Sequence, residues 1–139
     1  MAAWGKEAEA VMAERFGTDT VIPLATVEDG IPYVRSVNAL YVDGAFYFVT
    51  DARSNKVRHI QKEPTVAIAG EWFTAHGKAV DLGPWGDEAN RQIAQTLRNG
   101  FADWIDNGHH DLSDVNTRIL RIDLTDAVLY SHGTRYERS

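Results

Sequence analysis

Two cations and a serine stand at the start of a predicted helix, within residues 50–60, TDARSNKVRHI. Arg53 and Lys56 fall at its first turn, where free N–H groups carry partial positive charge and normally attract acidic side chains. Each cation there costs about 0.3–1 kcal/mol unless an anion lies nearby. A phosphate group would be such an anion, bound by both cations, the Ser54 hydroxyl and the helix N–H groups. The alternative is a helix capped by Asp51 or Ser54 whose cations are solvated.

The histidines give a weaker signal for catalysis. His109 and His110 are adjacent after a predicted helix end. Adjacent side chains point apart, so the pair chelates one metal ion poorly and is predicted to lie in a solvated loop. His76 and His132 belong to separate strand segments, where each could line a pocket or be a structural residue. The sequence therefore assigns no metal site.

Several catalytic classes lack the residues that they need. The chain has no cysteine, which excludes disulfides, zinc–thiolate sites and a thiol nucleophile. It has neither the G-x-S-x-G pattern of a hydrolase elbow nor the G-x-G-x-x-G pattern of a dinucleotide-binding turn. Neither a hydrolase nor a Gly-rich dinucleotide site is predicted.

Residues 70–77, GEWFTAHG, contain two adjacent aromatic residues. Alternation along a strand would place Trp72 and Phe73 on opposite faces of the sheet. One ring would then pack in the core, and the other would lie at an interface or against a flat ligand. Core packing remains the simpler account of either ring taken alone.

The elements that must position these residues are mostly strands. Apolar and β-branched alternation, with Asp43-Gly44 as a hairpin signal, predicts an antiparallel sheet. A sheet of this kind in a short chain tends to close into a small barrel. The predicted strands cover 20–27, 31–42, 45–50, 65–73, 75–82, 117–124 and 127–132, and the predicted helices cover 3–16, 53–62 and 87–107, with a polar tail over 133–139.

Chain length and net charge limit the number of domains and the kinds of partner to expect. The 139 residues suit one domain over residues 1–139. The net charge of −6, without a Lys/Arg run, argues against nucleic acid as a partner. No apolar run approaches the ~18 residues of a membrane span. The first 17 residues carry five charges and do not resemble a secretory signal, so the cytoplasm is the expected location.

The stretch VNALYVDGAFYFVTDARSNKVRHIQKEPTVAIAG resembles the flavin-binding split barrels related to pyridoxamine 5′-phosphate oxidase. The family pattern is a strand with an arginine, a D-G hairpin, a strand that ends in an aromatic residue and threonine, an S-x-K helix start, and a proline before the next strand. In this sequence the strand arginine is Arg35 and the hairpin is Asp43-Gly44. The strand ends at residues 48–50, the helix starts at residues 54–56, and the proline is that of Glu63-Pro64. The likeness covers residues 20–82, and the remainder looks like a small bacterial subgroup of the superfamily.

The resemblance implies a mainly β (α+β) fold, a six-stranded antiparallel split barrel with flanking helices. It also implies a homodimer that holds flavin mononucleotide (FMN) in a groove at the subunit interface. The family's phosphate contacts fall on Arg35, Ser54 and Lys56, with Thr50 nearby and Arg53 in place of a second cation that is absent at Asn55. The backbone of Arg35, Ser36, Val37 and Asn38 would run beside the isoalloxazine ring. Trp72 or His76 of the second copy would close the site.

Departures from the family pattern limit the expected activity. The segment SVNALYV lacks the oxidase's basic residue, and GTRYERS lacks its Arg- and Trp-rich substrate segment. The expected activity is therefore an FMN-dependent redox reaction on a small organic substrate other than pyridoxamine phosphate. His76 is the nearest candidate for an acid or base. The alternatives are a deazaflavin-dependent reductase, a flavin- or haem-binding module without turnover, and a scaffold without ligand. Helix 87–107 would pack on the barrel, either as a lid over the flavin edge or as plain packing.

Overall fold

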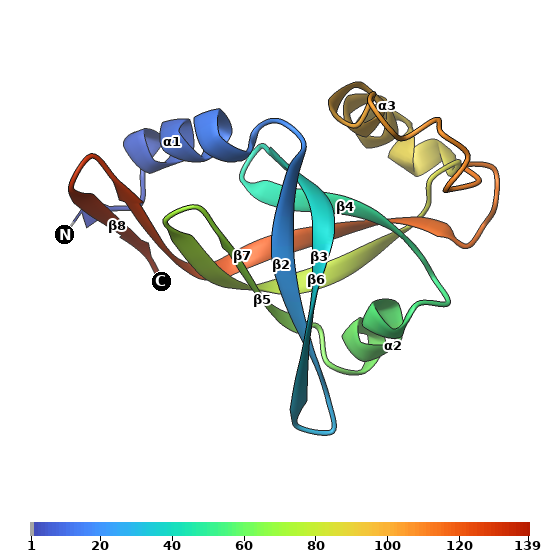
Figure 1. The fold of residues 1–139 in the computed structure, drawn as a ribbon, viewed down its shortest axis with the longest axis horizontal. Helices are drawn as coiled ribbons and strands as arrows, with labels where there is room; N and C mark the ends of the chain where they lie inside the picture. The colour runs from blue at the N-terminus through green and yellow to red at the C-terminus, as the bar shows by residue number, and fades with distance from the viewer. Residues whose placement is uncertain (1) are drawn as a thin grey trace.

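The computed structural model describes residues 2–139, which form an antiparallel barrel with two added strands and flanking helices (Figure 1). In chain order the elements are β1 (Ala2–Ala3), α1 (Lys6–Phe16), β2 (Thr20–Glu28), β3 (Ile31–Val42), β4 (Ala45–Asp51), α2 (Asn55–Lys62), β5 (Thr65–Gly70), β6 (Phe73–Pro84), the 3₁₀ helix η1 (Glu88–Asn90), α3 (Arg91–Gly100), β7 (Thr117–Ser131) and β8 (Thr134–Arg138).

The barrel closes because β6 pairs with both β5 and β7. The strand order is β7-β4-β3-β2-β5-β6, and the further pairing of β6 with β7 joins the two ends into a six-stranded ring. The β6–β7 register shifts at His76/Gly77 and between Asp81 and Pro84. Irregularities of this kind bend a strand and help a sheet to curve. The predicted six-stranded antiparallel barrel with flanking helices is confirmed.

Tight turns set the register of the early hairpins. Asp29-Gly30 joins β2 to β3, and Asp43-Gly44 joins β3 to β4. All four residues have positive φ, between 48° and 88°. Two successive residues of this kind form the turn that matches the twist of paired strands. The hairpin predicted at Asp43-Gly44 is therefore confirmed, and Asp29-Gly30 forms a second turn of the same kind.

The barrel interior is an apolar core with aromatic rings at one end. Phe16 from α1 packs edge-on against Phe46 of β4, with ring centroids 5.6 Å apart, and lies 5.2 Å from Phe73 of β6. All three side chains are buried. The end of α1 thus closes one mouth of the barrel with a buried ring, and the strands are held around it.

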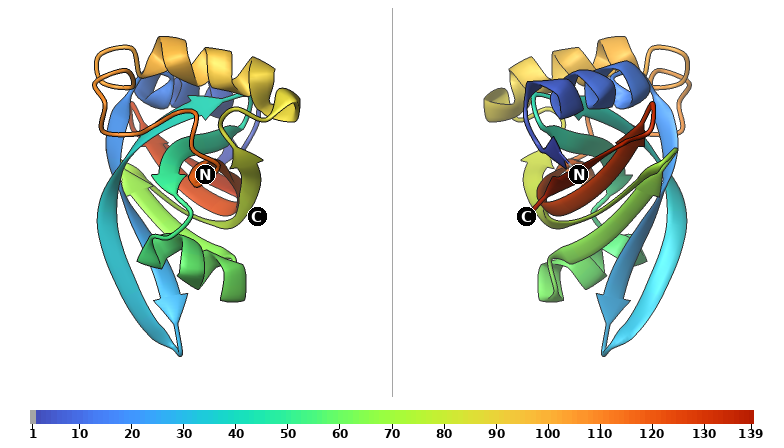
Figure 2. Two further views of the ribbon diagram at one scale, coloured as in Figure 1. Left: turned by 90° about the vertical axis from the view of Figure 1, so that its right-hand side faces the viewer. Right: turned by 90° about the vertical axis from the view of Figure 1, so that its left-hand side faces the viewer.

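A second apolar cluster lies outside the barrel, beneath α3. Leu40 and Ile119 point out from β3 and β7 and meet Leu97 and Phe101 of the α3 segment. A Cβ added at Gly100 would come within 2.6 Å of a Leu40 methyl group, so a larger residue there would require the Leu40 side chain to move. Figure 2 shows α1 and α3 at one end of the molecule and the β2–β3 hairpin projecting from the other. The α3 segment is therefore packed on the outer face of the sheet.

Some predicted element boundaries are wrong. The helix over 87–107 is divided into η1, α3 and a run of turns, because α3 ends at Gly100 and Phe101 leaves helical geometry. The two strands over 117–132 are one strand, β7, and the tail over 133–139 forms β8, which pairs with β7. The helix over 3–16 begins only at Lys6, after a short strand parallel to β8. The pairing of β1 with β8 joins the two ends of the chain, so local sequence patterns could not predict it.

The predicted placement of Trp72 and Phe73 on one strand is also wrong. β5 ends at Gly70, and Trp72 occupies the turn with φ 52°, whereas Phe73 begins β6 and is buried.

None of the helices within residues 2–139 combines the length and apolar character that crossing a bilayer requires.

Candidate functional site

A cleft of about 370 Å³ lies between the middle of the sheet, the start of α2 and the segment that follows α3. Its volume falls in the range of about 300–1,000 Å³ that small-molecule sites occupy. The lining combines polar and aromatic side chains. It consists of Ser36, Val37, Asn38, Val49, Thr50, Lys56, Trp104, Asn107, His109 and His110.

Lys56 is the cation of the cleft. Its Nζ donates a hydrogen bond to Thr50 Oγ1 at 3.0 Å, and the side chain is half-buried. Among residues 2–139, no carboxylate forms an ion pair with it. Burial lowers the pKa of Lys56, and the nearby charge of Arg35 lowers it further, while Asp51 acts in the opposite direction. Lys56 is therefore a partly desolvated positive charge that an anion would stabilise.

Arg35 contributes charge to this region from the side of the sheet. Its guanidinium donates to Thr26 Oγ1 at 2.7 Å and to the Leu24 carbonyl at 3.2 Å, and burial lowers its pKa. Thr26 in turn shares a hydrogen bond with His59 Nδ1 at 2.8 Å. Both Thr26 and His59 are buried. Arg35 is not part of the cleft lining, but a buried polar chain fixes its position next to Lys56.

The hydroxyl groups at the start of α2 face the same region. Ser54 is the N-cap residue, and its Oγ accepts a hydrogen bond from the Val57 N–H at 3.4 Å. Its Oγ also lies 3.5 Å from Thr50 Oγ1. Of the two residues predicted as possible caps, Asp51 and Ser54, Ser54 caps the helix. The capped end of the helix adds its partial positive charge to that of Lys56.

Arg53 forms an ion pair with the carboxylate of Asp51 in the same chain. Its Nε and terminal nitrogen bind the two oxygens of Asp51 at 2.9 and 2.7 Å, and the pair is exposed to solvent. The bidentate contact with Arg53 holds the pKa of Asp51 well below its usual range. Arg53 is therefore neutralised beside the cleft, whereas Lys56 is not.

Trp72 and His76 lie elsewhere on the chain. Trp72 is 68% exposed at the β5–β6 turn, where its ring meets Tyr130 edge-on at 6.5 Å. His76 is exposed on β6, with its Nδ1 2.9 Å from Asp126. Within one chain, neither side chain lines the cleft. Their predicted role across a subunit interface stays a prediction.

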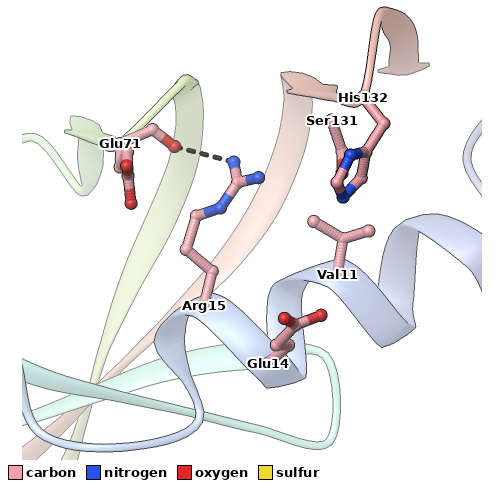
Figure 3. Close-up of a pocket in the computed structure, with 6 residues that line it drawn as sticks. All are labelled: Val11, Glu14, Arg15, Glu71, Ser131 and His132. Atoms are coloured by element: carbon pink, nitrogen blue, oxygen red, sulfur yellow. Dashed lines mark hydrogen bonds between the residues drawn. The ribbon is translucent and has the colours of Figure 1, made fainter.

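A second cavity, of about 330 Å³, lies next to the Trp72 turn, between α1 and the β7–β8 turn (Figure 3). Arg15 crosses it, donating to the backbone carbonyl of Glu71 at 2.8 Å and to that of Tyr130 at 3.1 Å. These bonds tie α1 to two hairpin ends. The guanidinium is thus already engaged by the chain's own carbonyl groups.

The predictions from sequence missed the wall formed by Trp104, Asn107, His109 and His110. The solvated-loop prediction for the histidine pair is wrong for His110, which is half-buried and lines the cleft. The carboxylate of Asp19 holds Trp104 in place. It accepts hydrogen bonds from the Trp104 indole at 2.8 Å and from the Asn38 amide at 3.0 Å. Trp104 and Asp19 are 85 positions apart, so no local pattern could indicate their contact.

Structures that share this fold come from proteins with low sequence identity. A pyridoxamine 5′-phosphate oxidase-related, FMN-binding protein from Nostoc punctiforme aligns with a TM-score of 0.60 and 16% identity over 96% of this chain and 94% of its own. An FAD-binding protein from Mesorhizobium loti aligns with a TM-score of 0.63 and 20% identity over 85% and 90%. An F420 reductase aligns with a TM-score of 0.65 and 18% identity over 83% and 94%. At these identities the likeness establishes the fold alone.

The sequence comparison is more specific. No curated protein matches the chain. A family model described as pyridoxamine 5′-phosphate oxidase matches residues 8–128, which contain strands β2 to β6 and most of β7. The closed six-stranded barrel agrees with that assignment. The chain therefore belongs to the pyridoxamine 5′-phosphate oxidase family of split-barrel proteins.

Proposed function

We propose that the cleft at Lys56 binds the phosphate group of FMN. The observation that carries the proposal is the half-buried Lys56 ammonium, which has a hydroxyl partner in Thr50 but no carboxylate partner among residues 2–139. An unneutralised, partly desolvated cation is unfavourable by itself and becomes favourable when a phosphate enters. Ser54 at the capped start of α2 and Arg35 beside it complete the set that would hold the anion.

The remaining lining fits a planar ring. Ser36, Val37 and Asn38 of β3 line the cleft together with the indole-bearing Trp104 from the segment after α3. Aromatic surfaces of this kind favour flat, delocalised ligands. These residues would bind and orient the flavin, while the flavin itself would accept and return a hydride.

The proposed activity is a redox reaction of a small organic substrate at the bound flavin. Family membership and the FMN-binding fold neighbour support a flavin-type cofactor. A deazaflavin is the second candidate, because another neighbour is described as an F420 reductase. Both cofactors present a phosphate and a flat ring to the same residues, so direct competition between them at the cleft separates the two.

We further propose that the protein works as a homodimer with the cofactor at the subunit interface. The support is an exposed apolar surface on the β2–β3 hairpin, which we call the hairpin face. It comprises Val21, Pro23 and Val34, which the β2–β3 register places on the same side of the two strands, and Val21 and Val34 are 61% and 70% exposed. Apolar surface gathered in one place marks a site of association more often than isolated apolar residues do. A second copy would cover it.

The test of cofactor binding is a titration of the purified protein with FMN, followed by flavin fluorescence. Riboflavin, which has the same ring without the phosphate, is the matched control. We expect FMN to bind at least about tenfold more tightly than riboflavin, since a charge-assisted hydrogen bond contributes about 1.5–3 kcal/mol. Equal affinities would place the anchor away from Lys56, and no binding of either compound would refute the proposed function.

A further inference from the structure

His110 occupies a shared wall between two cavities. It lines the cleft that contains Lys56, and it also lines a neighbouring cavity on the far side of the same segment. Its ring lies 6.1 Å from that of Trp104 and 5.0 Å from that of His109. Asp19 holds Trp104 in place, so the position of His110 is supported from one side by a fixed ring.

The charges around His110 come from several elements. Lys56 on α2, Asp51 at the end of β4 and His109 beside it all act on the imidazole. The neighbouring cavity adds charged side chains that belong to α3 and to the segment after it, namely Arg98, Asp106 and Asp111. Two of these are already paired, because Arg98 binds Asp106 at 2.6 Å. Asp51 is likewise bound by Arg53.

These surroundings disfavour the protonated ring. Burial lowers the pKa of His110 most, and His109 lowers it further; Asp51 opposes them in part, and Lys56 adds a smaller lowering effect. These effects favour the uncharged imidazole, in which one ring nitrogen can accept a proton. A phosphate beside Lys56 would reverse the balance, since a dianion attracts the cation that Lys56 repels.

We propose that His110 is a ligand-contacting residue of the cleft and takes up a proton from solvent when a phosphate-bearing ligand binds beside Lys56. The proposal rests on the proposed function for its site, and it adds a linkage between ligand binding and pH. The proton goes to the free ring nitrogen, which then becomes a hydrogen-bond donor. His109 also lines the cleft, but it is exposed where His110 is half-buried, and its ring meets that of His110 edge-on.

The first test uses the apo protein and inorganic phosphate. The pKa of each histidine is measured by NMR with and without phosphate. We expect the His110 signal to shift its titration to higher pH when phosphate is present, while His132, on the β7–β8 turn away from the cleft, keeps its titration unchanged. A His110 titration that phosphate leaves unaltered would overturn the proposal.

The second test uses FMN and calorimetry in two buffers whose ionisation enthalpies differ, between pH 6.5 and 8. The expected result is proton uptake on binding that disappears in the His110→Gln variant and persists in His132→Asn. The affinity of the natural protein should fall by up to about tenfold per pH unit of linked titration across this range, beyond any fall seen in His110→Gln. The same proton uptake in both proteins would contradict the proposal.

The two proposals fail in different ways. If FMN binds but His110→Gln changes neither proton uptake nor the slope of affinity against pH, the inference about His110 is wrong and the flavin site stands. If FMN does not bind but inorganic phosphate shifts the His110 titration, the flavin assignment is wrong and the anion-linked histidine stands.

Discussion

The ammonium of Lys56 lies 3.0 Å from the hydroxyl of Thr50, at the point where the end of β4 meets the start of α2. A second Lys–Thr pair, Lys78 and Thr65, has an even shorter contact of 2.6 Å on β6 and β5. The two pairs differ in their surroundings. Lys78 is exposed, whereas Lys56 is half-buried in a cleft beside Arg35. This difference makes one lysine a candidate anion ligand and the other its control.

Replacing Lys56 with alanine should weaken FMN binding by about 1.5–3 kcal/mol, or about 10- to 150-fold, because a charge-assisted hydrogen bond to phosphate is lost. Lys78→Ala removes a lysine–threonine bond of the same type away from the cleft and should leave the affinity unchanged. Fluorescence titration measures both. Equal losses in the two variants would mean that the effect is one of overall charge.

Lys56→Met should stabilise the apo protein while it removes stabilisation by ligand. The Lys56 pKa is lowered in the folded chain, so its charge opposes folding below that pKa, and the penalty fades as pH rises through it. Methionine keeps the length of the side chain without the charge. At pH 7 we expect a higher Tm than the natural protein in buffer, and no rise on adding phosphate. A lower Tm in buffer would contradict this account.

Asp19→Ala should loosen the wall of the cleft that contains Trp104. The substitution leaves the indole of Trp104 and the amide of Asn38 without their acceptor, at a cost of about 1–3 kcal/mol to the free energy of unfolding. Urea denaturation measures the loss, and acrylamide quenching of tryptophan fluorescence should increase. The exposed Asp103, one residue before Trp104, gives the control variant Asp103→Ala, which should change neither.

Val34→Asp should separate the proposed dimer. Val34 is 70% exposed on the hairpin face, and a carboxylate there would be buried against an apolar surface of the second copy. Light scattering should give twice the 15.5 kDa mass of one chain for the natural protein and the mass of one chain for the variant. Val115 is 67% exposed outside the hairpin face, so Val115→Asp is a matched control that should remain dimeric.

Local sequence patterns were enough to predict much of the barrel. The Asp43-Gly44 turn and the alternating strands around it are set by the backbone freedom of neighbouring residues, and β3 has its predicted bounds, Ile31–Val42. The same holds for the start of α2, where Ser54 caps the helix. Residues 36–38, Thr50 and Lys56 come together in one cleft because adjacent hairpin strands and the following helix bring them there.

Tertiary structure decided the features that depend on residues far apart in the chain. Arg53 and Lys56 look equivalent in sequence, yet Asp51 neutralises only Arg53, because side-chain direction at the end of β4 determines which cation a carboxylate can reach. Trp104 and His110 joined the site through contacts across the fold with Asp19 and the α2 region. Sequence by itself determined the strands, turns and helix cap, which are local. Only the folded chain decided which charge stays unneutralised, since that depends on burial and on partners brought together by barrel closure.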